Sequence, residues 1–139
     1  MSGIEGIGAI IGVADVACRS IFGLYNFVRT LKDAPLEVQG ILRETSALQL
    51  CLTELRVLET AGEETHAAIR RVGLSQVVNS CGEACGRLHN DLIKWKIHSS
   101  QTWNAKLQFR RHKKSIDSTL AEIGEAKQTA ILTVLVTQL

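Results

Sequence analysis

Residues 74–95 read LSQVVNSCGEACGRLHNDLIKW. Apolar or small residues recur along this stretch in alternating steps of four and three, as they do along the buried seam of a coiled coil. This pattern predicts a long helix that buries one face against other helices. The residues at these positions are Leu74, Val78, Cys81, Cys85, Leu88, Leu92 and Trp95.

Three further patterns with helical spacing flank this stretch. They cover residues 10–31, 38–58 and 109–135, and a shorter helix is expected at 63–72. Pro35 marks the start of the second helix, and Gly62 marks its end. Because the connections between the long helices are short, we predict an all-α fold. The expected architecture is an antiparallel four-helix bundle with an additional short helix and an N-terminal apolar helix.

The composition supports the same fold class. Of the 139 residues, 45% are apolar and 22% are charged, and the chain holds a single proline. Its formal net charge of +2 is too small to require a polyanionic partner. We expect one domain over residues 1–139. The apolar helical pattern continues to the end of the chain, TAILTVLVTQL (129–139), which predicts that this domain is the N-terminal part of a longer protein.

The N-terminus gives no sign of a secretory or membrane-spanning segment. It lacks the basic region that begins a signal peptide, and Glu5 stands there instead. The uncharged run 6–14 has nine residues, whereas a spanning helix needs about 20. We therefore expect a protein that is soluble and cytoplasmic at rest, with its cysteines reduced.

Cys81, Cys85 and His89 have a spacing that suggests a zinc site. The first and the last would stand about 12 Å apart on a helix that rises 1.5 Å per residue, too far for one tetrahedral ion. Because both cysteines fall on the predicted buried seam, we interpret them as core residues. The sequence also contains no P-loop, nucleophile elbow or zinc-protease motif. We expect no enzyme activity, metal or cofactor.

Charge is distributed unevenly along the chain. No acidic residue stands between Asp91 and Asp117, and Trp95 and Trp103 are interleaved with the basic residues there. Basic clusters of this size attract anionic lipid headgroups, and tryptophan favours membrane interfaces. The alternative is a solvated corner between helices; nucleic acid ranks behind both, because no helix-turn-helix pattern accompanies the cluster. The candidate lipid-binding residues are Lys94, Lys96, Lys106, Arg110, Arg111, Lys113 and Lys114.

The start of the chain, SGIEGIGAIIGVADVACRS (2–20), combines a helical apolar pattern with several glycines. Gly8 and Gly12 have the G-x-x-x-G spacing that lets helices approach closely in membranes. One interpretation is a short helix tucked against the bundle. The other is a segment released on activation, into lipid or into contact with further copies. The membrane-insertion candidates are Gly3, Ile4, Gly6, Ile7, Gly8, Ile10, Ile11, Gly12 and Val13.

The order of these features resembles the HeLo-like N-terminal domains of fungal NOD-like receptors, the STAND proteins. The resemblance rests on the glycine-dotted apolar start, on LYNF (24–27), on KDAPLE (32–37), and on the regular leucines Leu48, Leu52 and Leu55. Trp103, the basic run 110–114 and LAEIGEAKQTAILTVL (120–135) are similar to the family's closing helix. The similarity covers nearly the whole chain.

The resemblance implies a helical bundle related to HeLo domains and to the executioner domain of mixed-lineage-kinase-domain-like proteins. It implies an effector of regulated cell death that self-associates and disrupts the plasma membrane on activation, with anionic lipids as partners. In that family the N-terminal apolar helix is the membrane-active element. Glu5 and Asp15 make this segment more polar here, which leaves open an alternative: a non-toxic module that recruits like domains of other proteins.

Overall fold

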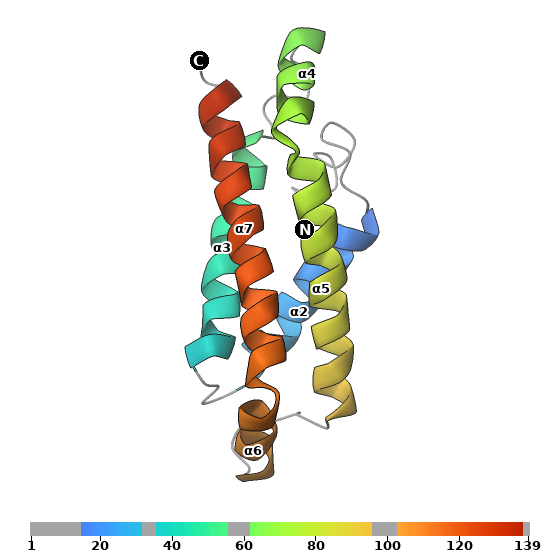
Figure 1. Ribbon diagram of the computed structural model, residues 1–139, viewed down its shortest axis with the longest axis vertical. Helices are drawn as coiled ribbons and strands as arrows, with labels where there is room; N and C mark the ends of the chain where they lie inside the picture. The colour runs from blue at the N-terminus through green and yellow to red at the C-terminus, as the bar shows by residue number, and fades with distance from the viewer. Residues whose placement is uncertain (1–14, 32–35, 56–61, 96–102, 138–139) are drawn as a thin grey trace.

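The computed structural model describes residues 15–31, 36–55, 62–95 and 103–137, and for residues 15 and 103–106 it describes the backbone alone. Within these ranges the chain forms six α-helices and no strand. They are α2 (Asp15–Arg29), α3 (Leu36–Leu55), α4 (Glu63–Val72), α5 (Leu74–Lys94), α6 (Trp103–Arg111) and α7 (Lys113–Thr137), as Figure 1 shows. The predicted all-α class is confirmed.

The four long helices form a bundle in which each packs against two others. Helix α2 packs against α3 and α5, and α7 packs against the same two helices. Consecutive long helices alternate in direction along the molecule, while α4 extends it at one end and α6 at the other (Figure 1). The predicted four-helix bundle with an additional short helix is therefore confirmed.

Two of the neighbouring pairs run parallel, which a simple up-and-down bundle would not contain. Ala17 lies beside Gly82, and Ser20 beside Gly86, so positions along α2 and α5 increase together. Gly40 lies beside Leu120, and Glu44 pairs with Lys127, so α3 and α7 are also parallel. Helices α3 and α5 lie at opposite corners of the bundle, and α4 stands between them in the chain.

The seam predicted along residues 74–95 forms the inner face of α5. Its first six positions are all buried, with side chains at most 1% exposed, and they join the main hydrophobic core. Trp95, the seventh, is half-buried and packs against that core. The alternating steps of four and three therefore identify the core-facing residues of this helix.

The breaks between helices are partly those that the sequence predicts. Helix α4 occupies the predicted residues and ends at Gly73, whose φ of 81° is in the left-handed region that favours glycine. The pattern at 109–135, predicted as one helix, is divided between α6 and α7 at His112. Backbone hydrogen bonds of 3.1 Å from His112 to Gln108 and from Ile116 to His112 continue across this break. No glycine or proline marks the break in the sequence.

None of the helices in the described ranges combines the length and the apolar content that crossing a bilayer requires. The predicted apolar helix at the start of the chain, with its candidates from Gly3 to Val13, lies outside the described residues.

Candidate functional site

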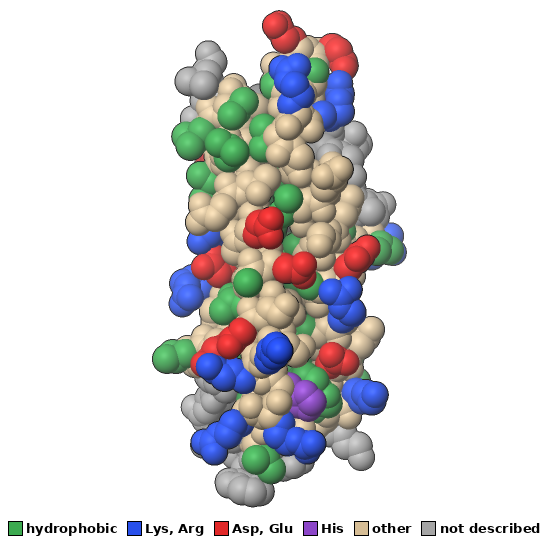
Figure 2. Space-filling model, viewed as in Figure 1, with side chains coloured by type: hydrophobic (Ala, Val, Ile, Leu, Met, Phe, Trp, Pro, Cys, Tyr) green, Lys and Arg blue, Asp and Glu red, His purple; other side chains and the backbone are tan. Residues whose placement is uncertain are grey.

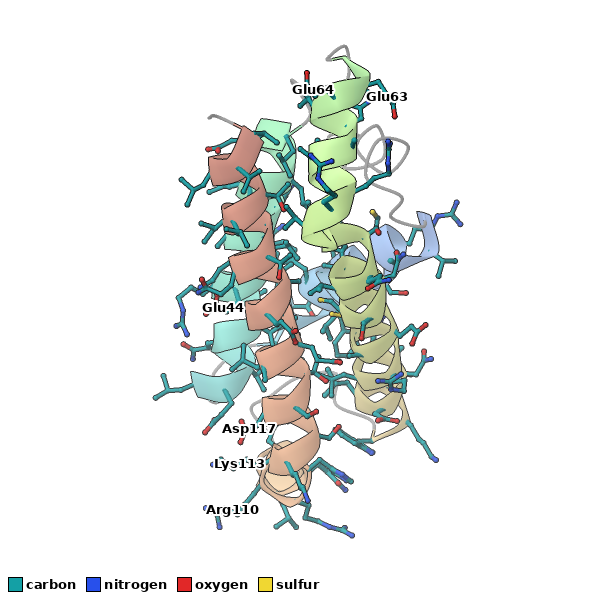
Figure 3. The ribbon with its side chains drawn as sticks, turned by 45° about the horizontal axis from the view of Figure 1, so that its top comes forward. Glu44, Glu63, Glu64, Arg110, Lys113 and Asp117 are labelled. Atoms are coloured by element: carbon teal, nitrogen blue, oxygen red, sulfur yellow. The ribbon has the colours of Figure 1, made fainter. Side chains whose placement is uncertain are left out.

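Basic side chains gather where α5 ends, α6 runs and α7 begins. Figure 2 shows lysine and arginine side chains around the end of the molecule that carries α6. Figure 3 labels Arg110 and Lys113 at this end, far from Glu63 and Glu64 at the other. We call this group the basic end. Its described members, all exposed, are Lys94, Arg110, Arg111, Lys113 and Lys114.

The basic end keeps most of its positive charge. Asp117 lies 3.7 Å from the Nζ atom of Lys113, and both side chains are about half exposed. Such an exposed pair contributes roughly 0–1 kcal/mol and is screened by salt. Within the described residues, no ion pair engages the other four basic side chains, so they are available to an anionic surface.

Trp95 and His112 connect the helices that carry these charges. Their rings are stacked, with centroids 3.7 Å apart and planes 11° from parallel. The Trp95 amide also donates to the Asp91 carbonyl at 2.8 Å, which closes the last turn of α5. Since His112 stands between α6 and α7, the stack holds the end of α5 against the α6–α7 junction. Basic residues from three helices are thereby kept at one end of the bundle.

Two predicted members of the basic cluster have no described side chain. Lys96 lies outside the described residues, and for Lys106 and Trp103 only the helical backbone of α6 is described. The other five predicted members lie on α5, α6 and α7 and form the basic end.

The cysteines of the suggested zinc motif lie in the core. The Sγ atoms of Cys81 and Cys85 are 4.0 Å apart, and both residues are fully buried. Their mutual hydrogen bond, together with burial, raises the pKa of the Cys81 thiol and keeps it protonated. The ring of His89 instead packs against Phe27, with centroids 5.2 Å apart. In the part of the chain that the structure describes, no group of three or more potential ligands could hold a metal.

A small cleft opens between α5 and α7. Its volume is about 160 Å³, below the roughly 300–1,000 Å³ of typical small-molecule sites. Ser80 donates a hydrogen bond of 3.3 Å to Glu122 at its wall. The lining residues are Gln76, Val77, Ser80, Glu122 and Glu125. The cleft is open to solvent, and the hydrogen bond between Ser80 and Glu122 is exposed.

Among the described glycines, the closest contact is made by Gly82, which the sequence analysis did not single out. A Cβ atom on Gly82 would lie 2.5 Å from the Cα atom and 2.6 Å from the Cβ atom of Ala17. One turn later, a Cβ on Gly86 would lie 3.3 Å from the Ser20 Oγ atom. The signal was present in the sequence as Gly82-x-x-x-Gly86, the same spacing as Gly8 and Gly12.

A second exposed feature lies near the other end of α7. Ile131, Leu132 and Leu135 are 37%, 51% and 57% exposed. Isolated apolar side chains on a surface are ordinary, but these three lie within two turns of one helix. We call them the apolar tip.

Comparison with known protein families gives a match over most of the chain. Residues 3–130 match the family model described as pigment biosynthesis cluster protein PigL N-terminal. No curated protein and no solved structure gives a significant match. The family's description gives a position in a protein and a gene cluster, and it specifies neither a reaction nor a ligand. Because the match covers far more than half of the 139 residues, the chain belongs to the family of the PigL N-terminal domain.

Proposed function

We propose that this domain binds anionic membrane surfaces through its basic end. The observation that carries the proposal is the gathering of five exposed basic side chains from three helices around a stacked Trp95. Each basic residue near an anionic surface contributes about 1 kcal/mol to binding. A tryptophan beside them suits the boundary between headgroups and water.

We further propose the finer assignment that the HeLo-like resemblance implies. The domain is then an N-terminal effector of a NOD-like-receptor-type protein that acts without catalysis. It is cytoplasmic at rest, self-associates on activation, and disrupts the plasma membrane with its first apolar residues. Family membership supports an N-terminal helical domain, and the basic end supports attraction to anionic lipid.

The test of surface binding is cosedimentation with vesicles that contain an anionic lipid. Removing two charges from the basic end, in Arg110→Gln/Lys114→Gln, should weaken binding about 30-fold, since two residues at about 1 kcal/mol each are lost. The matched control Arg71→Gln/Arg87→Gln removes two exposed charges from α4 and α5, away from the basic end. Equal weakening in both pairs would show that net charge, and not the basic end, drives binding.

The membrane-disrupting step has its own test in dye leakage from the same vesicles. Replacing Gly8 and Gly12 with leucine should abolish leakage if close helix approach by the first residues is required. Binding should persist, because the basic end is unchanged. Leakage that is unaffected would exclude the insertion role while leaving surface binding intact.

The alternative function is a homotypic interaction module without affinity for lipid. The apolar tip is the observation that favours it, since like domains could meet through exposed leucine and isoleucine side chains. This function predicts concentration-dependent association in sedimentation velocity without vesicles. Leu132→Ser/Leu135→Ser should then abolish association, whereas the surface-binding function predicts no change in vesicle binding.

A further inference from the structure

A serine directly follows the basic residues at the junction of α6 and α7. The sequence there is RRHKKS (110–115), and Ser115 lies in the first turn of α7. Its side chain is partly exposed, and its hydroxyl makes no hydrogen bond within the described residues. The carbonyl oxygen of the same residue accepts a hydrogen bond of 3.1 Å from the Thr119 hydroxyl. The Ser115 hydroxyl is therefore available for modification.

The charges that precede this hydroxyl are all positive. A protein kinase whose substrate groove carries carboxylates recognises cations at such positions, because opposite charges attract across an interface. Ser118 is also exposed, but Asp117 stands directly before it. The charge pattern therefore favours Ser115 over Ser118. The four exposed cations before Ser115 are Arg110, Arg111, Lys113 and Lys114.

This segment lies where a kinase can reach it. Helix α6 extends the molecule at one end, and the break at His112 separates it from α7 (Figure 1). A helix terminus opens at a smaller free-energy cost than the core of a bundle. The first turn of α7 can therefore enter the substrate groove of a kinase.

We propose that Ser115 is a phosphorylation site for a serine/threonine kinase that prefers basic substrates, and that its phosphate releases the domain from anionic membranes. This inference rests on the proposed function. In the transfer, the Ser115 Oγ atom bonds to the γ-phosphorus of ATP. ADP leaves with the electron pair of the broken P–O bond, and the hydroxyl proton passes to a base of the kinase.

The phosphate acts on the basic end in two ways. It carries about −1.5 to −2 charges at pH 7, which offsets about two of the basic side chains and repels anionic headgroups. Its oxygens also accept charge-assisted hydrogen bonds from lysine and arginine side chains beside it, which then no longer contact lipid. The loss of about two effective charges should weaken binding to anionic vesicles about 30-fold.

The first experiment asks whether Ser115 accepts the phosphate. The protein is incubated with ATP and the catalytic domain of protein kinase C, a kinase that prefers basic substrates, and mass spectrometry locates the modified residue. Phosphate should be found at Ser115, and Ser115→Ala should lose it. Absence of phosphate at Ser115, or modification confined to Ser118, overturns the proposal.

The second experiment measures cosedimentation with vesicles of phosphatidylcholine and phosphatidylglycerol. The phosphorylated protein should bind about 30-fold more weakly than the unmodified protein, and Ser115→Glu, which adds one negative charge, about fivefold more weakly. The matched control is Ser75→Glu. Ser75 is also partly exposed and in the first turn of a helix, but it lies at the opposite end of α5 from Lys94. This control should leave vesicle binding nearly unchanged.

The outcomes separate the inference from the proposed function. Phosphate at Ser115 together with the expected loss of vesicle binding supports the inference. Equal weakening by Ser115→Glu and Ser75→Glu, or binding that the phosphate does not change, overturns the inference and leaves the proposed function in place. If the unmodified protein does not bind the vesicles, the proposed function is wrong and release from membranes is overturned with it.

Discussion

The two parallel helix pairs of this bundle are held together by different means. Helices α2 and α5 approach so closely that Gly82 has no room for a Cβ atom beside Ala17. Helices α3 and α7 meet through longer side chains: the Leu120 side chain covers Gly40, and Glu44 and Lys127 form an ion pair of 2.6 Å. The contact between α2 and α5 leaves no space for added side-chain atoms, whereas the side chains between α3 and α7 can shift to make space. The same parallel geometry is therefore stabilised by backbone contact in one pair and by flexible side chains in the other.

The sharpest test of this difference compares glycine-to-alanine changes. Gly82→Ala should destabilise the protein by about 3 kcal/mol, because the new methyl group would meet the Ala17 backbone, which cannot rotate away. Gly124→Ala, on α7, meets no atom of the described residues within 4 Å and should stabilise the protein by about 0.5–1 kcal/mol. Gly40→Ala should have an effect between the two, since the Leu120 methyl at 3.2 Å can shift.

Urea denaturation measures these three free energies of unfolding on one scale. Helix propensity is improved by the same amount in each variant, so the differences between them report the space beside each glycine. If Gly82→Ala were as stable as Gly124→Ala, close approach of α2 and α5 would not be a feature of the folded protein.

The ion pair of the second helix pair is the next largest expected contribution. Glu44 and Lys127 side chains are each 20% exposed, so solvent screens them less than a surface pair. A double-mutant cycle with Glu44→Gln and Lys127→Met should give a coupling energy of about 1 kcal/mol, decreasing in high salt. The same cycle on the exposed pair of Lys113 and Asp117 is the control and should give less. Equal coupling in the two cycles would contradict the structural difference in burial.

A smaller effect on stability is expected between α2 and α3, where the two parallel helix pairs are in contact. Thr45 is buried between α3 and α2, and its hydroxyl has no hydrogen-bond partner among the residues that the structure describes. Thr45→Val replaces this hydroxyl with a methyl group of similar size and should stabilise the protein by roughly 0.5–1 kcal/mol. Thr133→Val is the matched control, because the Thr133 hydroxyl donates to the Thr129 carbonyl at 2.8 Å and is satisfied. If thermal unfolding showed Thr133→Val to be more stable than Thr45→Val, the Thr45 hydroxyl would not be the unsatisfied one.

The last effect is absent at neutral pH and appears only at alkaline pH. Since the pKa of the Cys81 thiol is raised in the folded state, the native protein retains a proton that the unfolded chain loses above about pH 8.5. Stability from this group is complete below that pH and decreases above it. In Cys81→Ala the decline of unfolding free energy between neutral and alkaline pH should be shallower. An unchanged slope would mean that other groups cause the alkaline loss.

Periodicity in the sequence predicted most of the fold because burial of one helix face is a local pattern. The residues of α4 were predicted completely. The buried seam of α5 was also predicted, except that its last residue, Trp95, is only half-buried. The division at His112 was not predicted, since the apolar spacing continues through it without a helix breaker. The parallel pairing was also missed, because a helical stripe specifies which face is buried and not which helix covers it.

The candidate site was predictable in composition but not in arrangement. The run without acidic residues showed the basic cluster, and helices from three parts of the fold place five of its members at one end. The stack of Trp95 on His112 joins residues from separate helices, which no spacing along the chain reveals. The spacing of Gly82 to Gly86 is visible in the sequence, but the helix that these glycines meet is not.

The contact at position 82 also restricts how this protein can diverge. Glycine has the smallest side chain, so every missense change at this codon adds atoms where Ala17 stands. A descendant chain with a larger residue at position 82 needs α2 and α5 to move apart. A single further substitution cannot supply that displacement. Position 82 therefore permits one amino acid for as long as the helices keep their present spacing.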